Sequence, residues 1–156
     1  MNIVIANRQR TMRVDSRQLK LIVGELFAQL KITDAEMGIN LVAAREMALV
    51  NETFLNHAGS TDVITFDHTE SGKQNQLHGE LFICMDDAIL QAKQFQTSWQ
   101  SEVMRYIVHG VLHLLGHDDL KPPLRRKMKR EENRLVRLLS KKFSLAQISG
   151  APKLRA

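Results

Sequence analysis

The chain has 156 residues, of which 44% are apolar and 25% are charged, and it carries a net charge of +5. This balance is typical of one soluble globular domain, and no apolar stretch approaches the ~18 residues of a membrane span, so we expect neither a membrane segment nor a signal peptide. The single cysteine, Cys84, excludes an internal disulfide and a zinc finger built on several thiolates, and it fits a cytoplasmic protein.

The first part of the chain alternates short apolar runs with amphipathic segments. Residues 3–5 are β-prone, and residues 16–30 repeat apolar side chains at the spacing of one helix face. Residues 37–43 predict a strand, and residues 45–54 predict a second helix. We therefore expect a strand, a helix, a strand and a helix in this order.

The middle of the chain contains the clearest strand. Residues 62–66, with the sequence DVITF, combine β-branched side chains with an aromatic one. Residues 68–78 are polar and contain a glycine, which predicts a loop or a hairpin turn. Residues 79–84 predict another strand, and the two acidic residues that follow favour a helix over residues 86–95.

Two further helices are expected in the last third. One begins at a serine cap, either Ser98 or Ser101, and continues to about Leu115, where Gly116 ends it. The other begins at a pair of prolines and covers residues 122–142. Between Lys121 and Lys142 the chain has ten basic and two acidic residues, while the rest has 12 basic and 15 acidic. This basic helix indicates either a polyanionic partner or a solvated surface.

The sequence has no internal repeat and no linker that would divide it. We predict one α+β domain over residues 1–146, in which a small mixed sheet of about four strands packs with about five helices. Residues 147–156 are expected to form a disordered tail.

A candidate metal site lies at the end of the helix that stops near Leu115. His109 and His113 are four residues apart, so their side chains stand on one helix face and can bind one ion. Gly116 lets the chain turn back toward them. Asp119 has the same offset from that glycine as the third histidine of the extended HExxH zinc motif, which favours it as the third ligand. His117 is the alternative third ligand.

Zinc is the metal that this pattern favours, because two imidazoles and one further ligand leave a position for water in catalytic zinc sites. A set of two histidines and one carboxylate also suits iron or manganese. The residue after His109 is Gly110 rather than the glutamate that zinc peptidases use as a general base, which counts against a peptidase of that kind.

The stretch from His109 to Asp118 resembles the signature of the bacterial YbeY family of metal-dependent endoribonucleases, His-Gly-x-Leu-His-Leu-x-Gly-(Tyr/His)-Asp-His. At the last position the family has a third histidine ligand, and this chain has Asp119. Residues 60–66, STDVITF, resemble the family's Pro-Thr-Asp-Val-Leu-Ser-Phe strand, and residues 79–83 resemble its Gly-Asp-Ile-x-Ile strand. The resemblance extends over about residues 1–140.

The resemblance implies a cytoplasmic hydrolase that cleaves single-stranded RNA in ribosomal RNA maturation and ribosome quality control. It also implies ribosomal RNA and the ribosome, with the small subunit favoured, as partners, and one divalent metal ion per chain, with zinc favoured. In that setting the basic helix is expected to contact RNA phosphates. The residues expected to do so are Arg125, Arg126, Lys129 and Arg130.

One departure from the family bears on activity. The family commonly has an arginine after an aromatic residue before the Thr-Asp strand, and here Phe54 is followed by Leu55. A ribosome-associated assembly factor with a mainly structural metal and little nuclease activity is therefore the alternative function. A hydrolase for another substrate, such as a peptide, ranks last.

The sequence does not identify a catalytic general base. By residue type, Glu80, Asp62 and His117 are the candidates. The strand carboxylates among them can equally serve as structural hydrogen-bonding groups.

Overall fold

The computed structural model describes residues 1–55, 61–70 and 75–150, and it has a four-stranded mixed sheet at its centre. The strand order is β1-β2-β4-β3, in which β1, β2 and β4 run parallel and β3 pairs antiparallel with β4. The strands are β1 (Asn2–Asn7), β2 (Asp34–Val42), β3 (Val63–Asp67) and β4 (Gln76–Cys84). β3 is therefore an edge strand.

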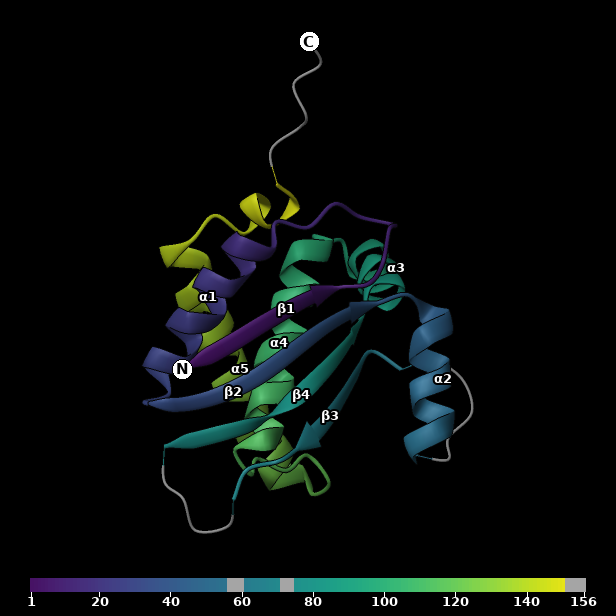
Figure 1. Cartoon of the computed structure of the whole chain (residues 1–156). Coiled ribbons are helices and arrows are strands. Elements are labelled where there is room, and N and C mark those ends of the chain that lie inside the picture. The colour runs from purple at the N-terminus through teal and green to yellow at the C-terminus, as the bar shows by residue number, and fades with distance from the viewer. Residues whose placement is uncertain (56–60, 71–74, 151–156) are drawn as a thin grey trace.

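Five α-helices accompany the sheet in the described part of the chain, and Figure 1 shows α1, α4 and α5 behind it, with α2 to the side of β3. The helices are α1 (Ser16–Gln29), α2 (Ala44–Leu55), α3 (Met85–Phe95), α4 (Trp99–Leu114) and α5 (Pro122–Lys142), followed by the short 3₁₀ helix η1 (Leu145–Ser149). This arrangement confirms the predicted α+β domain with a small mixed sheet. Among the described residues, no helix is both long and apolar enough to cross a lipid bilayer.

α4 is the central helix of the fold, because it contacts α3, α5, β3, β4 and η1. Ser98 caps its first turn, accepting a hydrogen bond from the backbone N–H of Ser101 at 3.1 Å. Gly110 lies where α4 meets the sheet. A Cβ atom at this position would lie 2.8 Å from Leu81 Cδ2 and 3.3 Å from Val63 Cγ1, so the absence of a side chain lets the helix pack closely on β3 and β4.

Two strands begin three residues earlier than predicted. β2 begins at Asp34 rather than at Met37, and β4 begins at Gln76, inside the predicted loop of residues 68–78. These polar strand ends pair with each other, Asp34 with Gln76 and Glu36 with His78, so partner strands extend the sheet beyond the apolar runs.

The predicted disordered tail also differs over its first residues. Gln147 to Ser149 belong to η1, and Ile148 is fully buried against the core. The carbonyl oxygen of Ile148 accepts a hydrogen bond from the backbone N–H of Asp15 at 2.7 Å. One buried isoleucine thus anchors a segment whose composition is otherwise polar. Residues 151–156 of the predicted tail lie outside the described residues.

Candidate metal centre

The predicted turn after α4 is present and brings the chain back toward the helix. Gly116 has a φ of 97°, in the left-handed region where glycine is favoured. The N–H of Gly116 donates to the carbonyl of His113, and the N–H of His117 donates to the carbonyl of Leu112, each at 3.0 Å. This is the Schellman pattern of hydrogen bonds, which ends the helix and redirects the following residues.

The turn places Asp119 beside the two histidines of α4. Asp119 Oδ2 lies 3.7 Å from His113 Nε2 and 4.0 Å from His109 Nε2, and the two imidazole rings are 4.7 Å apart between centroids. One ligand atom from each of the three residues lies within 4.8 Å of the other two. Two imidazole nitrogens and one carboxylate oxygen are a donor set that fits zinc and other divalent metals.

His117, the alternative third ligand, is not among the described residues that converge at this point. It lies near Glu131 of α5 instead, where it helps to lower the pKa of that carboxyl, after the larger effect of the hydrogen bond from Arg134. The structure therefore brings together His109, His113 and Asp119 and leaves His117 outside the group.

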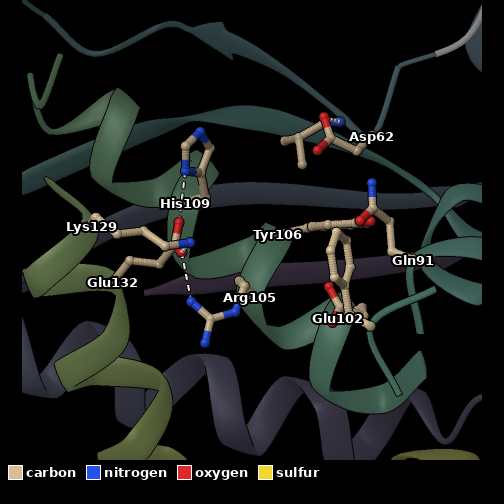
Figure 2. A pocket seen from close by; sticks show the side chains of 10 residues that line it. Asp62, Gln91, Glu102, Arg105, Tyr106, His109, Lys129 and Glu132 are labelled. Atoms are coloured by element: carbon tan, nitrogen blue, oxygen red, sulfur yellow. Dashed lines mark hydrogen bonds and ion pairs between the residues drawn. The ribbon is translucent and has the colours of Figure 1, made fainter. Parts of the chain in front are cut away.

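Glu132 of α5 orients the ring of His109 through a hydrogen bond at Nδ1. Its Oε1 lies 2.8 Å from His109 Nδ1, and its side chain is almost completely buried. An ionised carboxylate can only accept, so Nδ1 carries a proton, and in the neutral ring Nε2 has the lone pair on the side of Asp119. Arg105 donates to Oε2 of the same carboxylate at 2.7 Å, and Lys129 donates to Oε2 at 3.0 Å (Figure 2).

Burial alone would raise the pKa of Glu132, but the hydrogen bonds from His109, Lys129 and Arg105 outweigh it and lower the pKa to about 2. The hydrogen bond to Glu132 in turn raises the pKa of His109 against the opposing effect of burial, and the carboxylates of Asp119 and Asp62 add to the rise. Glu132 is thus a permanently charged acceptor that favours a single tautomer of His109.

Sequence reasoning missed Glu132, although a signal was present. The buried positions of α5 are Met128, Glu132, Leu135, Val136 and Leu139, spaced as one helix face. A glutamate inside an apolar stripe needs a buried partner and therefore marks a special site.

Two pockets are lined by histidines of the cluster, and both include His109. The first, which we call the Tyr106 pocket, has a volume of about 450 Å³ and lies between α3, α4, α5 and the start of β3 (Figure 2). It is lined by Asp62, Val63, Gln91, Phe95, Glu102, Arg105, Tyr106, His109, Lys129 and Glu132. The second, the Leu55 pocket, has a volume of about 300 Å³ and is lined by Leu55, Asp62, Val63, Ile64, Thr65, His109 and His113. Both pockets therefore open beside the candidate metal site, at His109.

The two carboxylates among the general-base candidates, Asp62 and Glu80, differ in position. Asp62 lines both pockets together with His109. Glu80 lies on the opposite face of the sheet from α4, because it alternates with Leu81, which packs against Gly110, and it lies 3.9 Å from His68. Of the strand carboxylates, only Asp62 is brought to the site.

The basic residues predicted to contact RNA lie at the beginning of α5. A groove of about 440 Å³, the α5 groove, is lined by Pro123, Arg126, Lys129, Arg130 and Asn133. Lys129 belongs to both this groove and the Tyr106 pocket. Arg125 instead donates from Nε to the carbonyl of Asp119 at 3.0 Å, and so ties α5 to the turn that carries the carboxylate.

The chain is similar to proteins of one family. A family model described as Endoribonuclease YbeY matches residues 4–140. Proteins with the name Endoribonuclease YbeY include one from Parabacteroides distasonis, 42% identical over 90 residues, which are 58% of this chain and 61% of that protein. Another, from an Anaeromyxobacter species, is 34% identical over 125 residues, 80% of this chain and 65% of its relative.

The chain thus spans less than two thirds of the length of these two relatives. A third protein of the same name, from Chlorobaculum parvum, is 34% identical over 115 residues, which are 74% of this chain and 77% of that protein. The fold is similar to the solution structure of TM1509 from Thermotoga maritima, with a TM-score of 0.69 at 23% identity over 99% of this chain and 100% of that one. On the family match and the HGVLHLLGHDD stretch that carries the site, the chain belongs to the YbeY family.

Proposed function

We propose that this chain is a metal-dependent endoribonuclease that cleaves single-stranded RNA in ribosomal RNA maturation and ribosome quality control. The observation that carries the proposal is the convergence of His109, His113 and Asp119, whose ligand atoms lie within 4.8 Å of one another beside two open pockets. The family to which the chain belongs, described as an endoribonuclease, supports the same reaction.

Zinc is the metal we propose for the site. Catalytic zinc sites usually have three protein ligands, whereas structural zinc sites have four. When bound, zinc would supply an acidified water and positive charge for the phosphate oxygens. The chain contributes the ligands, the orientation of His109 by Glu132, and the cations Arg105 and Lys129 beside it.

Asp62 is the residue we propose as the proton acceptor. Its carboxylate shares both pockets with His109, and its negative charge contributes to the raised pKa of that histidine. A carboxylate at the edge of the site can accept a proton from an attacking water. The N–H of Val63 donates to Asp62 Oδ1 at 2.8 Å, which holds the carboxylate in place.

RNA is the proposed substrate because the α5 groove shares Lys129 with the Tyr106 pocket, and exposed basic side chains there can contact a phosphate backbone without reading its sequence. That the RNA is single-stranded is a proposal that rests on the resemblance to the YbeY family. Ribosomal RNA and the small ribosomal subunit as partners, and a cytoplasmic location, are proposals that rest on the resemblance to the YbeY family.

A second candidate function is a ribosome-associated assembly factor with a structural metal and little nuclease activity. The observation that favours it is Leu55, which stands where the family commonly has an arginine and lines the pocket beside His109 and His113. An apolar side chain there supplies no charge to a phosphate.

The test is cleavage of a single-stranded RNA and of its duplex by the zinc-loaded chain, with bound metal quantified, beside His113→Ala. His78→Ala is the matched control, because His78 pairs with Asp34 at 3.0 Å and is not part of the site. We expect about one zinc per chain, cleavage of the single strand only, and loss of both metal and cleavage in His113→Ala but not in the control. Metal bound at that ratio without cleavage above His113→Ala would instead favour the assembly factor.

A further inference from the structure

The Tyr106 pocket contains polar groups that the proposed metal chemistry does not use. Tyr106 is 6% exposed, and its hydroxyl has no hydrogen-bond partner within the described part of the chain. A buried hydroxyl without a partner is costly, and such groups are normally satisfied by protein, water or ligand. The side chain of Tyr106 lines a pocket of about 450 Å³, within the ~300–1,000 Å³ range of small-molecule sites.

The pocket has two chemically different sides, which Figure 2 shows with Tyr106 between them. On one side are the cations Arg105 and Lys129, next to His109. Arg105 uses Nη1 for Glu132 and Asn133, each at 2.7 Å, and among the described residues no partner occupies its Nε or Nη2. These donors suit a phosphate group.

The other side presents hydrogen-bond acceptors and an amide. Glu102 accepts a hydrogen bond from the Thr97 hydroxyl through Oε1 at 2.6 Å, which leaves Oε2 for another donor. Gln91 adds an amide that can both donate and accept. Burial raises the pKa of Tyr106, and the carboxylates of Asp62 and Glu102 raise it further, so the hydroxyl stays protonated and can donate.

An aromatic side chain stands at the rim. Phe95, the last residue of α3, lines the pocket and is 61% exposed. Exposed aromatic rings next to basic grooves are where the bases of single-stranded nucleic acids stack, whatever their sequence. A phosphate-binding side, a polar side with unsatisfied groups and a stacking ring are the parts of a nucleotide site.

We propose that the Tyr106 pocket binds one unpaired nucleotide of the RNA strand, with a phosphate at Arg105 and Lys129, the base against Phe95, and the base edge at Tyr106, Gln91 and Glu102. This rests on the proposed nuclease function and deepens it, because a base held in this pocket cannot be paired in a duplex. The carboxylate of Glu102 can accept from the exocyclic amine of adenine, cytosine or guanine, and it repels the carbonyl oxygen that uracil has in place of the amine of cytosine.

The test uses the full-length, isotope-labelled chain in a buffer with a metal chelator, so that binding is measured without the metal reaction. The probes are the four ribonucleoside 5′-monophosphates and inorganic phosphate, followed by NMR at the Gln91 side-chain amide and at the backbone amides of Arg105 and Tyr106. We expect AMP, CMP and GMP to shift these signals. UMP should bind with an affinity lower by about threefold or more, because one hydrogen bond is lost.

Variants separate the pocket from the rest of α3. Phe95→Ala should weaken AMP binding about fivefold or more, as expected for a lost stacking ring. Leu90→Ala is the matched control, since Leu90 lies on the same helix with a similar exposed fraction of 63% and does not line the pocket. Tyr106→Phe should also weaken binding while leaving the spectrum otherwise folded.

Shifts confined to other parts of the chain, or inorganic phosphate giving the same shifts and affinity as AMP, would overturn the nucleotide site. RNA cleavage measured separately tells the two proposals apart. Cleavage by the zinc-loaded chain without nucleotide binding at the pocket leaves the nuclease standing and rejects this inference. Nucleotide shifts at the pocket without cleavage reject the nuclease and retain the binding site.

Discussion

Glu132 Oε1 accepts a hydrogen bond from His109 Nδ1 over 2.8 Å, linking α5 to a histidine of the candidate metal site on α4. Carboxylates in this position orient metal-bound histidines, and their removal typically lowers metal affinity by about 10–100-fold. We expect Glu132→Gln to weaken zinc binding by that order, because an amide is a poorer acceptor and attracts His109 less. Competition with a chromophoric zinc chelator measures the affinity.

The matched control for this variant is Glu131→Gln, which removes the adjacent carboxylate. Glu131 pairs with Arg134 on the surface of α5 rather than with a histidine of the site. Equal zinc affinities for the two variants would show that Glu132 serves only the packing of α5.

The identity of the third ligand can be tested by single substitutions in the turn. Asp119 Oδ2 lies 3.7 Å from His113 Nε2, whereas His117 is outside the cluster formed by the described residues. We expect Asp119→Ala to lose stoichiometric zinc and His117→Ala to retain it, measured by elemental analysis after gel filtration. The reverse result would make His117 the ligand and require the turn at Gly116 to rearrange on metal binding.

Leu55 offers a gain-of-function experiment. It lines the pocket beside His109 and His113 at the position where the family commonly has an arginine. We expect Leu55→Arg to raise the RNA cleavage rate by about tenfold or more, because a guanidinium can stabilise charge that develops on a phosphate. Leu49→Arg on the same helix, at a site that is 56% exposed, controls for added charge. An equal increase in both variants would indicate general attraction of RNA.

The burial of Tyr106 predicts that the free energy of unfolding falls at high pH. It is the only tyrosine of the chain, so the absorbance of tyrosinate reports this residue alone. Burial first, then the charges of Asp62 and Glu102, raise its pKa above the ordinary value of 10.0. Between pH 10 and the raised pKa, the folded protein keeps a proton that the unfolded chain has lost, so the free energy of unfolding falls by about 1.4 kcal/mol per pH unit from this group.

Denaturant unfolding at several alkaline pH values measures this effect, and Tyr106→Phe is expected to remove the contribution. A tyrosinate signal that rises near pH 10 in the folded protein would contradict the burial of the hydroxyl.

The α5 groove predicts a salt-dependent contribution to RNA affinity. Arg126 and Arg130 line it, while Arg137 and Lys141 are exposed farther along the same helix. We expect the double variant Arg126→Ala/Arg130→Ala to weaken binding of single-stranded RNA and to reduce the salt slope by about 0.7 per lost phosphate contact. The double variant Arg137→Ala/Lys141→Ala removes the same charge. If it lowers the slope equally, net charge rather than the groove attracts RNA.

Much of the candidate site could be predicted from the sequence because it is local. His109, His113 and Asp119 lie within eleven residues, and helix periodicity with one glycine turn fixes their relation. The same holds for the order of helices and strands, since most follow from runs of apolar residues and the others from local start signals such as the acidic pair at Asp86 or the prolines at Pro122.

Features that depend on tertiary pairing could not be predicted in this way. The polar ends of β2 and β4 become strands only because they pair with each other, and Gln91 and Tyr106 meet only because α3 packs on α4. Glu132 lies 23 residues beyond His109, and nothing in the spacing names its partner. The spacing of residues along the chain therefore predicts the three candidate ligands, whereas tertiary packing determines which side chains surround them.

The ligand set also determines how the site would respond to oxidants. Thiolate-bound zinc is released when peroxides or nitrosating agents attack the sulfur. Here the three clustered side chains offer only nitrogen and oxygen, and the only sulfhydryl of the chain, Cys84, is completely buried at the end of β4 in an apolar cluster with Val42, Met47 and Ile64. A metal held by these residues would therefore stay bound during oxidative stress that empties cysteine-based zinc sites.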